Sequence, residues 1–516
     1  MVSKQLFKST AIVGGMTLIS RLMGFARDML FANIFGVNAA TDAFFVAFRI
    51  PNFLRRLFAE GAFAQAFVPL LADYNQKGSR EALRLFIGRS SGTLAVLLVL
   101  VALAGVVAAP LLILLFAPGF LWEGNQYTLA VQMLRITFPY LFFVTLVAFA
   151  GAILNAQGRF AVPALTPVVL NIAMIAAAVW LAPLMDEPIV ALAWGVFAAG
   201  AIQLACQIPP LLRLNLLPRP RWAYRDPDVK RMLARMPSAI FGVSVVQVNL
   251  LFGTLVASFL APGSVSWLYY SDRLVEFPLG ILGIAVATVI LPHLSAHHAT
   301  SDQLGFSKAL DWGLKLTLLI GLPATLGLAL LAEPLLSTLF QYNEFGSGDV
   351  KMAGRSLMAY SLGLLAFMLI KVLAPGFTSR HDTRTPARFG GYSMIANVAF
   401  NLILVWPLAH AGVALATTLS AYLNAILLLR NLVATRIYRP CADWYGYIGR
   451  IVAANAAMSA FLYYFVDAGL WLNWNAAQRG LNLATTIGLA IIVYGSSLLV
   501  LGLRPRHIGL RESAAA

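Results

Sequence analysis

The sequence predicts an all-α integral membrane protein with fourteen transmembrane helices. Twelve of them are expected to form two six-helix lobes around a central cavity, and two further helices follow at the C-terminus. Three observations support this prediction: the apolar composition, the number and spacing of long apolar windows, and the alternation of basic loops between them.

The composition excludes a water-soluble protein. Of the 516 residues, 60% are hydrophobic and only 11% are charged, whereas about 25% are charged in a typical soluble domain. The mean hydropathy is +0.80, and no soluble fold hides that much apolar surface, because its exterior must face water. The 37 basic and 21 acidic residues give a net charge of +16. In a membrane protein this excess indicates cytoplasmic loops and an anionic substrate or lipid surface, so no nucleic-acid partner is expected.

Windows of about 20 apolar residues, the length that spans a bilayer as a helix, occur fourteen times. Turn-forming residues separate them, and the two longest also contain charges, so we expect these two to be tilted, bent or partly outside the bilayer. The N-terminus has no convincing cleavage site, which predicts a retained first helix. The windows are 10–33, 41–70, 90–116, 129–154, 161–182, 188–211, 236–260, 265–294, 311–340, 354–377, 387–406, 410–430, 446–467 and 481–503.

Loop charges test the number of spans. With the N-terminus in the cytoplasm, twenty-four lysines and arginines fall in loops on that side and three, Lys351, Arg355 and Arg479, on the other. Cytoplasmic loops of membrane proteins carry such an excess of basic residues. The bias therefore predicts fourteen spans and both termini in the cytoplasm.

The chain also contains an internal repeat. Pro69 and Pro292 are 223 residues apart, and so are Pro163 and Pro386, while Pro110 and Pro334 differ by 224. Six spans per repeat keep both copies in the same orientation, as in transporters whose repeats are related by an axis along the membrane normal. The predicted division is an N-lobe at 1–215, a basic cytoplasmic linker at 216–235, a C-lobe at 236–435, and a segment at 436–516 with the last two helices and a cytoplasmic tail.

Sequence motifs for catalysis and metal binding are absent. The chain has no phosphate-binding loop of the G-x-x-x-x-G-K-[ST] type and no serine nucleophile elbow. Cys206 and Cys441 are the only cysteines, and no Cys/His cluster has metal-ligand spacing. We therefore expect no enzyme, no cofactor and no metal site.

Charged residues inside the apolar windows are the candidate functional residues, because a charge in the bilayer is costly and is rare without a role. Two pairs can form within one helix, Arg56 with Glu60 and Arg273 with Glu276. The alternative is that these charges are structural ion pairs, and Asp28, Arg49, Arg56 and Glu60 fit either reading. The embedded charges are Arg21, Arg27, Asp28, Asp42, Arg49, Arg55, Arg56, Glu60, Asp272, Arg273, Glu276 and Lys371.

Bases outnumber acids in this set by seven to five, which points to an anionic ligand. Guanidinium groups form bidentate hydrogen bonds to phosphate, and such a surplus suits a diphosphate. Lys371 lies in the apolar stretch GLLAFMLIKVLAPGF with no charged neighbour. It is therefore expected to face the ligand.

Four segments carry a family resemblance. SRLMGFARDMLFANIFG (20–36), ATDAFFVAFRIPNFLRRLFAEGAFAQAFVPLL (40–71), GSVSWLYYSDRLVEFPLGILGIAVATVILPHLS (263–295) and KVLAPGFTSRHDTRTP (371–386) resemble the MurJ/MviN family of bacterial lipid II flippases. This family belongs to the multidrug/oligosaccharidyl-lipid/polysaccharide exporter superfamily. The resemblance covers essentially the whole chain, and it implies a multi-pass protein of the bacterial inner membrane.

The resemblance implies two lobes around a cationic cavity, with the last two helices forming a groove for the undecaprenyl tail. It implies that the substrate-binding charges are Arg21, Arg27, Asp42, Arg55, Arg273 and Lys371. Glu60, Asp272 and Glu276 match supporting acidic positions, and Ser266 matches a position on the cavity wall; Asp28 and Arg56 are added as supporting charges. Some relatives resemble sodium-coupled carriers, which have an acidic residue in helix 11. Residues 387–406, the predicted helix 11 of this chain, contain no Asp or Glu and have Asn397 and Asn401 instead. This difference argues against a sodium site.

The predicted function is translocation of lipid II, the undecaprenyl-diphosphate-linked peptidoglycan precursor, from the cytoplasmic to the periplasmic leaflet by alternating access. The expected partners are lipid II, membrane lipids and cell-wall synthesis proteins. The alternative is a multidrug exporter or an exporter of other polyprenyl-linked oligosaccharides, although a drug exporter for cations would favour acids over bases. A non-transporting scaffold would need no embedded charges, and a glycan polymerase would need clustered carboxylates in an outside loop.

Overall fold

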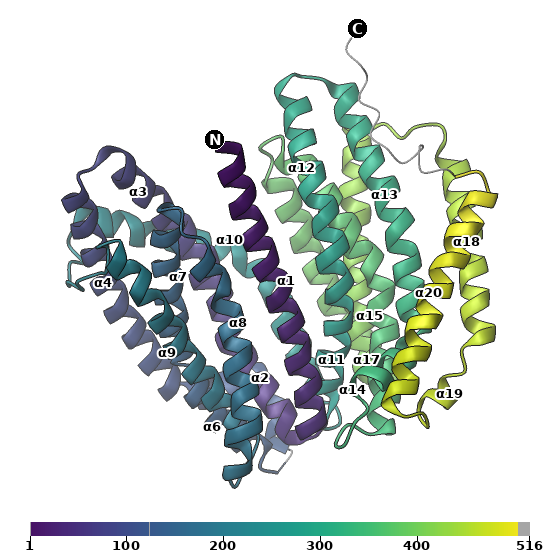
Figure 1. The fold of residues 1–516 in the computed structure, drawn as a ribbon, viewed down its shortest axis with the longest axis horizontal. Coiled ribbons are helices and arrows are strands. Elements are labelled where there is room, and N and C mark those ends of the chain that lie inside the picture. Colours follow the sequence, from purple (N-terminus) through teal and green to yellow (C-terminus); the bar gives the residue numbers. More distant parts are fainter. Residues whose placement is uncertain (1, 123, 504–516) are drawn as a thin grey trace. The chain divides into compact units, whose positions relative to one another are not determined.

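The computed structural model describes residues 2–122 and 124–503; the side chains at 2–12, 59–62, 64, 77, 238–250, 282, 284–285 and 468 lie outside its description. Over these residues the regular structure is entirely helical, and no strand occurs in the described ranges. Figure 1 shows the long helices that dominate both halves of the chain. This confirms the predicted all-α membrane class.

The chain divides into two compact units, Met1–Ser266 and Trp267–Ala516. The predicted boundary at 235/236 rests on the sequence repeat, whereas these units are defined by contacts between residues. The repeat-based boundary therefore stays a prediction. The elements of the first unit are α1 (Val2–Phe35), α2 (Ala39–Arg55), η1 (Arg56–Phe63), α3 (Ala64–Lys77), α4 (Arg80–Val107), α5 (Ala109–Phe116), η2 (Pro118–Trp122), α6 (Gln126–Thr137), α7 (Tyr140–Ala156), α8 (Ala161–Ala176), η3 (Ala177–Leu181), η4 (Ala182–Leu184), α9 (Val190–Arg213) and α10 (Pro227–Ala257).

The second unit contains the remaining helices, and α11 begins at the boundary. Its elements are α11 (Ser264–Pro278), η5 (Leu279–Gly283), α12 (Ile284–Ala299), α13 (Gln303–Leu330), α14 (Ala332–Phe340), α15 (Ser347–Leu373), α16 (Pro375–Thr378), α17 (Arg384–Ala434), α18 (Trp444–Phe465), α19 (Ala468–Trp471) and α20 (Ala476–Val500).

All fourteen predicted windows fall on helices. Within the described part of the chain, nine helices are long and apolar enough to cross a membrane, or ten if the bent pair Ser264–Ile281 and Val286–Ala299 is one span. The 51-residue α17 holds two of the predicted windows, and its backbone breaks at Ala409, where φ is +48°. The exact number of fourteen spans stays a prediction.

The two windows expected to be bent are both interrupted by a π-helix. In the first repeat η1 follows α2, and in the second repeat η5 follows α11. Their first residues, Arg56 and Leu279, are 223 residues apart, the same offset as the prolines. A π-helix inserts an extra residue into the turn and is frequent at functional sites. Both interruptions directly follow segments that carry embedded charges.

The basic segment at 216–235 is held against α4. The backbone N–H of Arg221 donates to the Gly88 carbonyl at 2.9 Å, and Arg89 pairs with Asp226 at 2.6 Å. A Cβ atom at Gly88 or Gly92 would overlap the backbone of this segment, so glycine permits the close approach. The expected linker is thus an ordered part of the first unit.

The start of α10 is tied to the end of α3 by a tyrosine. The Tyr74 hydroxyl donates to the carboxylate of Asp228 in the first turn of α10. This hydrogen bond to a carboxylate, followed by burial, raises the pKa of Tyr74 to about 12. The contact adds a second link between the basic segment and the helices of the first unit.

The last two long helices pack on α13. Ile451 and Ala454 of α18 and Leu498 of α20 bury themselves against Leu319. In Figure 1, α18 and α20 run side by side within the second unit. Their remaining surfaces carry exposed apolar side chains, among them Val452, Leu481, Leu489, Ile491 and Ile492.

A buried arginine fixes the opposite end of this helix pair. Arg479 of α20 is 6% exposed and donates to four carbonyls: Trp471 at 2.8 Å, Leu472 at 3.0 Å, Ser337 at 3.1 Å and Gln341 at 2.9 Å. The last carbonyls of a helix lack intrahelical partners, and a cation there is favourable. Arg479 therefore links α20 to the C-terminal ends of α14 and α19.

Candidate functional site

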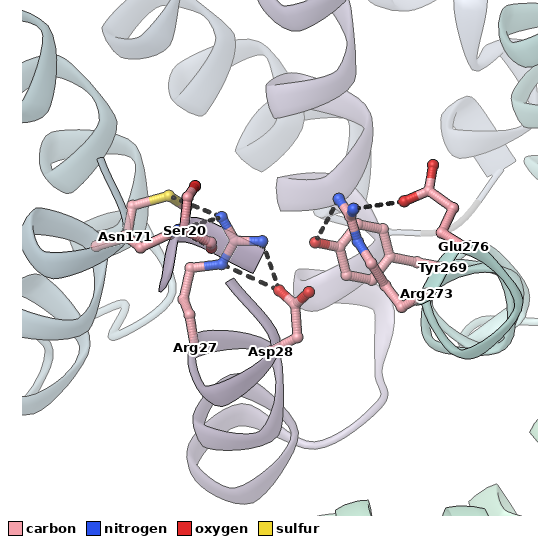
Figure 2. A network of polar contacts seen from close by, with 8 residues as sticks. Ser20, Arg27, Asp28, Asn171, Tyr269, Arg273 and Glu276 are labelled. Carbon is pink, nitrogen blue, oxygen red and sulfur yellow. Dashed lines mark hydrogen bonds and ion pairs between the residues drawn. The ribbon is translucent and has the colours of Figure 1, made fainter. Parts of the chain in front are cut away.

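Arg27 and Asp28 of α1 form a buried ion pair in the first unit (Figure 2). Two guanidinium nitrogens of Arg27 donate to Asp28 Oδ1 at 2.6 and 3.0 Å, and Nη1 donates to Asn171 Oδ1 at 3.1 Å. The exposed fractions are 5% for Arg27 and 1% for Asp28. In this conformation Arg27 joins α1 to α8, and its expected substrate contact would need these bonds to rearrange.

Arg21 lies two turns earlier on α1 and has a different environment. Its side chain is half-buried, and no hydrogen bond or ion pair of Arg21 occurs within the described part of the chain. The neighbouring Ser20 carbonyl accepts a hydrogen bond from Asn171 Nδ2 at 3.1 Å. Asn171 thus bridges α1 at Ser20 and Arg27.

Asp42, in the first turn of α2, is a fully partnered carboxylate. It is 2% exposed and accepts from the Gly263 N–H at 2.7 Å, the Ser266 N–H at 2.8 Å and the Ser266 hydroxyl at 2.5 Å. These donors belong to the turn before α11 and to its first residues. Two residues predicted separately, Asp42 as a substrate contact and Ser266 as a cavity-wall position, are thus hydrogen-bonded to each other, in an arrangement that holds two helices rather than presenting a charge.

The remaining charges of the second window lie on α2 and η1. Arg49 donates to Thr254 Oγ1 of α10, and Arg55 Nε donates to Asn52 Oδ1 at 2.8 Å. Arg49, Arg55 and Arg56 are each half-buried. The side chain of Glu60 lies outside the described residues, so its expected pair with Arg56 stays a prediction.

Arg273 of α11 combines an ion pair with an aromatic contact (Figure 2). Its Nη1 lies 2.8 Å from Glu276 Oε2, and Nη2 donates to the Tyr269 hydroxyl at 3.3 Å. The guanidinium carbon lies 4.9 Å from the centre of the Tyr269 ring, the geometry of a cation–π contact. The predicted i, i+3 pair is therefore present, and both of its members are partly accessible. Asp272, the other predicted acid of α11, is half-buried.

Lys371 stands in the last turn of α15 and is exposed. Its Cδ lies 3.4 Å from the place where Gly283 of η5 would carry a Cβ, so the aliphatic stem runs over the π-helix. No hydrogen bond or ion pair of Lys371 occurs among the residues that the structure describes. The sequence-based expectation of an isolated lysine agrees with this placement.

A second charge cluster of this unit escaped sequence reasoning. Lys315 of α13 lies 2.8 Å from Asp311 and 2.8 Å from Asp443, and Asp311 Oδ1 also accepts from Tyr438 and Trp444. Potential ligand atoms of Asp311, Cys441 and Asp443 lie within 4.8 Å of one another. The ammonium of Lys315 already compensates both carboxylates, so the cluster is explained as a link between α13 and the start of α18.

Three neutral partners were also missed: Asn171 beside Arg27, Tyr269 beside Arg273, and Thr254 beside Arg49. Asn171 had a usable signal, because an amide in an apolar window is costly to leave unpaired. Lys315 and Asp311 lie at the edge of their window, where a charge looks like a span boundary. Tyr269 and Thr254 have no distinguishing signal, since tyrosine and threonine are common in such helices.

Comparison with known proteins identifies the family. The sequence model described as "Lipid II flippase MurJ" matches residues 31–477. A probable lipid II flippase MurJ of Vibrio cholerae is 48% identical over 98% of this chain and 98% of its own length. The chain belongs to the MurJ family. A probable lipid II flippase MurJ of Haemophilus influenzae is 46% identical over 96% of this chain, and the lipid II flippase MurJ of Burkholderia cenocepacia is 40% identical over 97%.

Solved structures agree with this assignment to the MurJ family. A lipid II flippase MurJ in an inward closed conformation superposes with a TM-score of 0.78, covering 95% of this chain and 98% of that one at 25% identity. An inward-facing multidrug resistance transporter of the MATE family, in the MOP superfamily, has a TM-score of 0.68 at 14% identity and covers 81% of this chain. The second likeness concerns the fold alone and agrees with the predicted superfamily.

Proposed function

We propose that this chain is a flippase that moves lipid II from the cytoplasmic to the periplasmic leaflet of the inner membrane by alternating access. The observation that carries the proposal is the full-length similarity to proteins named lipid II flippases, at 40–48% identity. The embedded charges add independent chemical support, because lipid II carries an anionic diphosphate that must cross an apolar layer.

Arg21, Arg55, Arg273 and Lys371 are proposed as substrate contacts. Arg21 and Lys371 have no compensating acid among the described residues, and Arg273 keeps an accessible guanidinium beside Glu276. A diphosphate accepts hydrogen bonds from guanidinium and ammonium groups, and it neutralises their charge while bound. Arg27 is proposed as a contact that becomes available when its bond to Asn171 opens. The central cavity stays a prediction.

Asp42 and Ser266 are proposed as positioning residues rather than ligand contacts. The Asp42 carboxylate accepts hydrogen bonds from Gly263 and Ser266. Asp28 is likewise proposed to orient Arg27, and Asp272, Glu276, Arg56 and Glu60 to balance neighbouring charges.

Helices α18 and α20 are proposed to hold the undecaprenyl tail on their exposed apolar side chains, such as Ile491 and Ile492. A long-chain substrate buries apolar surface there at roughly 25 cal/mol per Å². Replacing both isoleucines with serine is expected to slow translocation of the undecaprenyl substrate but not of a short-chain analogue. Equal slowing of both substrates would exclude this role.

Both termini are proposed to be cytoplasmic, following the loop charges. A variant with Cys206→Ser and Cys441→Ser provides the background for new cysteines. An impermeant thiol reagent added to intact cells should label Trp122→Cys and leave Tyr224→Cys unmodified. Both positions are exposed, so the reverse pattern would contradict the orientation.

The chain is proposed to act as a transporter without catalysis, and export of drugs or of other lipid-linked oligosaccharides is the less favoured alternative. Cell-wall synthesis proteins stay predicted partners. Depletion of the protein in cells, followed by measurement of lipid II in each leaflet, tests the proposal. We expect lipid II to accumulate in the cytoplasmic leaflet; an unchanged distribution would contradict the proposed function.

A further inference from the structure

Asn171 of α8 connects Arg27 to a second helix. Its Oδ1 accepts from Arg27 Nη1 at 3.1 Å, and its Nδ2 donates to the Ser20 carbonyl at 3.1 Å (Figure 2). Ser20 and Arg27 are seven residues apart, so they lie on one face of α1, which packs along α8. Asn171 is 6% exposed, so little water competes for these two bonds.

The two neighbours of the Asn171 amide fix its orientation. A guanidinium only donates hydrogen bonds, and a backbone carbonyl only accepts them. The amide oxygen therefore faces Arg27 and the amide nitrogen faces Ser20, because the reverse orientation would lose both bonds. A leucine at position 171 would fill nearly the same space and would form neither bond.

Arg27 has two kinds of polar partner. Asp28 follows Arg27 directly in the same helix and accepts from Nε at 3.0 Å and from Nη2 at 2.6 Å, so this pair moves with α1. The bond to Asn171 joins two helices and exists only while the guanidinium is turned toward α8. Nη1 also lies 3.7 Å from the sulfur of Met174, which is a weak acceptor. Breaking the bond to Asn171 therefore frees Nη1 for another acceptor.

The bond between Arg27 and Asn171 is of a kind that a diphosphate can replace. A phosphate and a guanidinium are both charged and form bidentate bonds, whereas the Asn171 oxygen is neutral and accepts a single bond from Nη1. While no diphosphate is bound, the amide gives the buried guanidinium an acceptor that would be costly to lack. The neutral amide is thus strong enough to hold Arg27 and weak enough to be displaced.

We propose that Asn171 is a positioning residue for the transported diphosphate. It holds Arg27 against α8 while no substrate is bound, and it releases Nη1 when the diphosphate arrives. The proposal rests on the assignment of Arg27 as a substrate contact in the proposed function. It couples substrate binding to the contact between α1 and α8.

The affinity for undecaprenyl diphosphate, measured by native mass spectrometry of the purified full-length protein, tests this role. Asn171→Leu should lower the Kd about ten-fold, because Arg27 no longer loses a hydrogen bond when it turns to the diphosphate. Loss of structural support would instead weaken binding, so the sign of the change separates the two roles. An unchanged or higher Kd would overturn the proposal.

Transport kinetics provide a second measurement. In proteoliposomes, Asn171→Leu should lower the KM for lipid II without raising kcat, because only the state without substrate is destabilised. If Asn171→Leu does not fold, Asn171→Ser replaces it, since the serine oxygen is too short to reach Arg27. A folded variant with the wild-type KM would contradict the role of Asn171.

Two controls show whether the effect acts through Arg27. Gln203→Met removes another buried amide that holds α8, through its bond to the Thr166 carbonyl at 2.7 Å, and should leave the Kd unchanged. Asn171→Leu should also have no effect in a protein that carries Arg27→Ala and Asp28→Ala. A ten-fold lower Kd in either control would overturn the proposal.

Failure of this proposal and failure of the proposed substrate contact give different results. If the wild-type protein and the Arg27→Ala, Asp28→Ala variant bind undecaprenyl diphosphate equally, Arg27 is not a substrate contact, and both assignments are wrong. If the double variant binds more weakly but Asn171→Leu binds as the wild type does, only the role of Asn171 is wrong.

Discussion

Asp42 in α2 and Ser266 in α11 are joined twice, through the Ser266 backbone N–H at 2.8 Å and its hydroxyl at 2.5 Å. A third bond, from the Gly263 N–H, completes the surroundings of the carboxylate. A buried carboxylate needs such donors to remain favourable, and a removed partner costs more than the bond itself contributes. The Asp42 carboxylate therefore holds residues 263–266, the last residues of the first unit, against the start of α2.

Substitution of Asp42 should destabilise the protein in a graded way. Asp42→Ala leaves the backbone N–H groups of Gly263 and Ser266 unpaired and should lower the free energy of unfolding by about 2 kcal/mol or more. Asp42→Asn keeps one carbonyl oxygen and should cost less, and Ser266→Ala removes a single bond and should cost about 1 kcal/mol. Thermal unfolding in detergent, compared across the three variants, measures the order. Equal stability of all three would contradict the assigned hydrogen bonds.

The Arg27–Asp28 pair predicts a rescue. Arg27→Ala leaves Asp28 buried without its arginine and should reduce the amount of folded protein, since breaking a buried pair costs about 3–5 kcal/mol. The double variant Arg27→Ala with Asp28→Ala removes both charges and should restore much of that loss. Folded-protein levels in membranes provide the measurement, with Arg21→Ala as the matched control. A double variant as poor as Arg27→Ala alone would show that the pair is not the cause.

Arg479 should be the most stability-sensitive residue of the C-terminal helix pair. Arg479→Lys keeps the charge but cannot reach four carbonyls in a planar arrangement, so it should destabilise the protein nearly as much as Arg479→Ala. The neighbouring exposed Gln478 on the same helix provides a control as Gln478→Ala, which removes only a capping contact worth about 1 kcal/mol. Retention of normal thermal stability in Arg479→Ala would refute the structural role.

The helices were predictable because each apolar window is long and uniform. The unusual length and the embedded charges of the windows at 41–70 and 265–294 also indicated that these two segments are not straight helices. The positions of the π-helices η1 and η5 within these windows were not predictable, because a π-helix depends on local packing more than on residue type. The division into contact units was not predictable either: α10 belongs to the second repeat in sequence, but it packs against η1 and α3 of the first unit.

The candidate site was predictable as a set of residues and not as a set of contacts. Charge in an apolar window is visible in the sequence, and so are pairs within one helix turn such as Arg273 and Glu276. The partners of Arg27 and Asp42 are not visible, because Asn171 and Ser266 are 144 and 224 residues away along the chain. Sequence reasoning therefore found the excess of bases but could not say which base is compensated.

Arg21 and Lys371, which have no ion-pair partner among the described residues, allow the most direct test of the account. Lipid II translocation and folded-protein level should be measured together, in cells depleted of the wild-type protein and supplied with Arg21→Ala or Lys371→Met. The methionine keeps the apolar stem over Gly283 and removes only the charge. We predict normal levels of both variants together with accumulation of lipid II in the cytoplasmic leaflet. Normal translocation by both variants, or loss of folded protein in proportion to loss of translocation, would contradict the proposal that these cations carry the diphosphate.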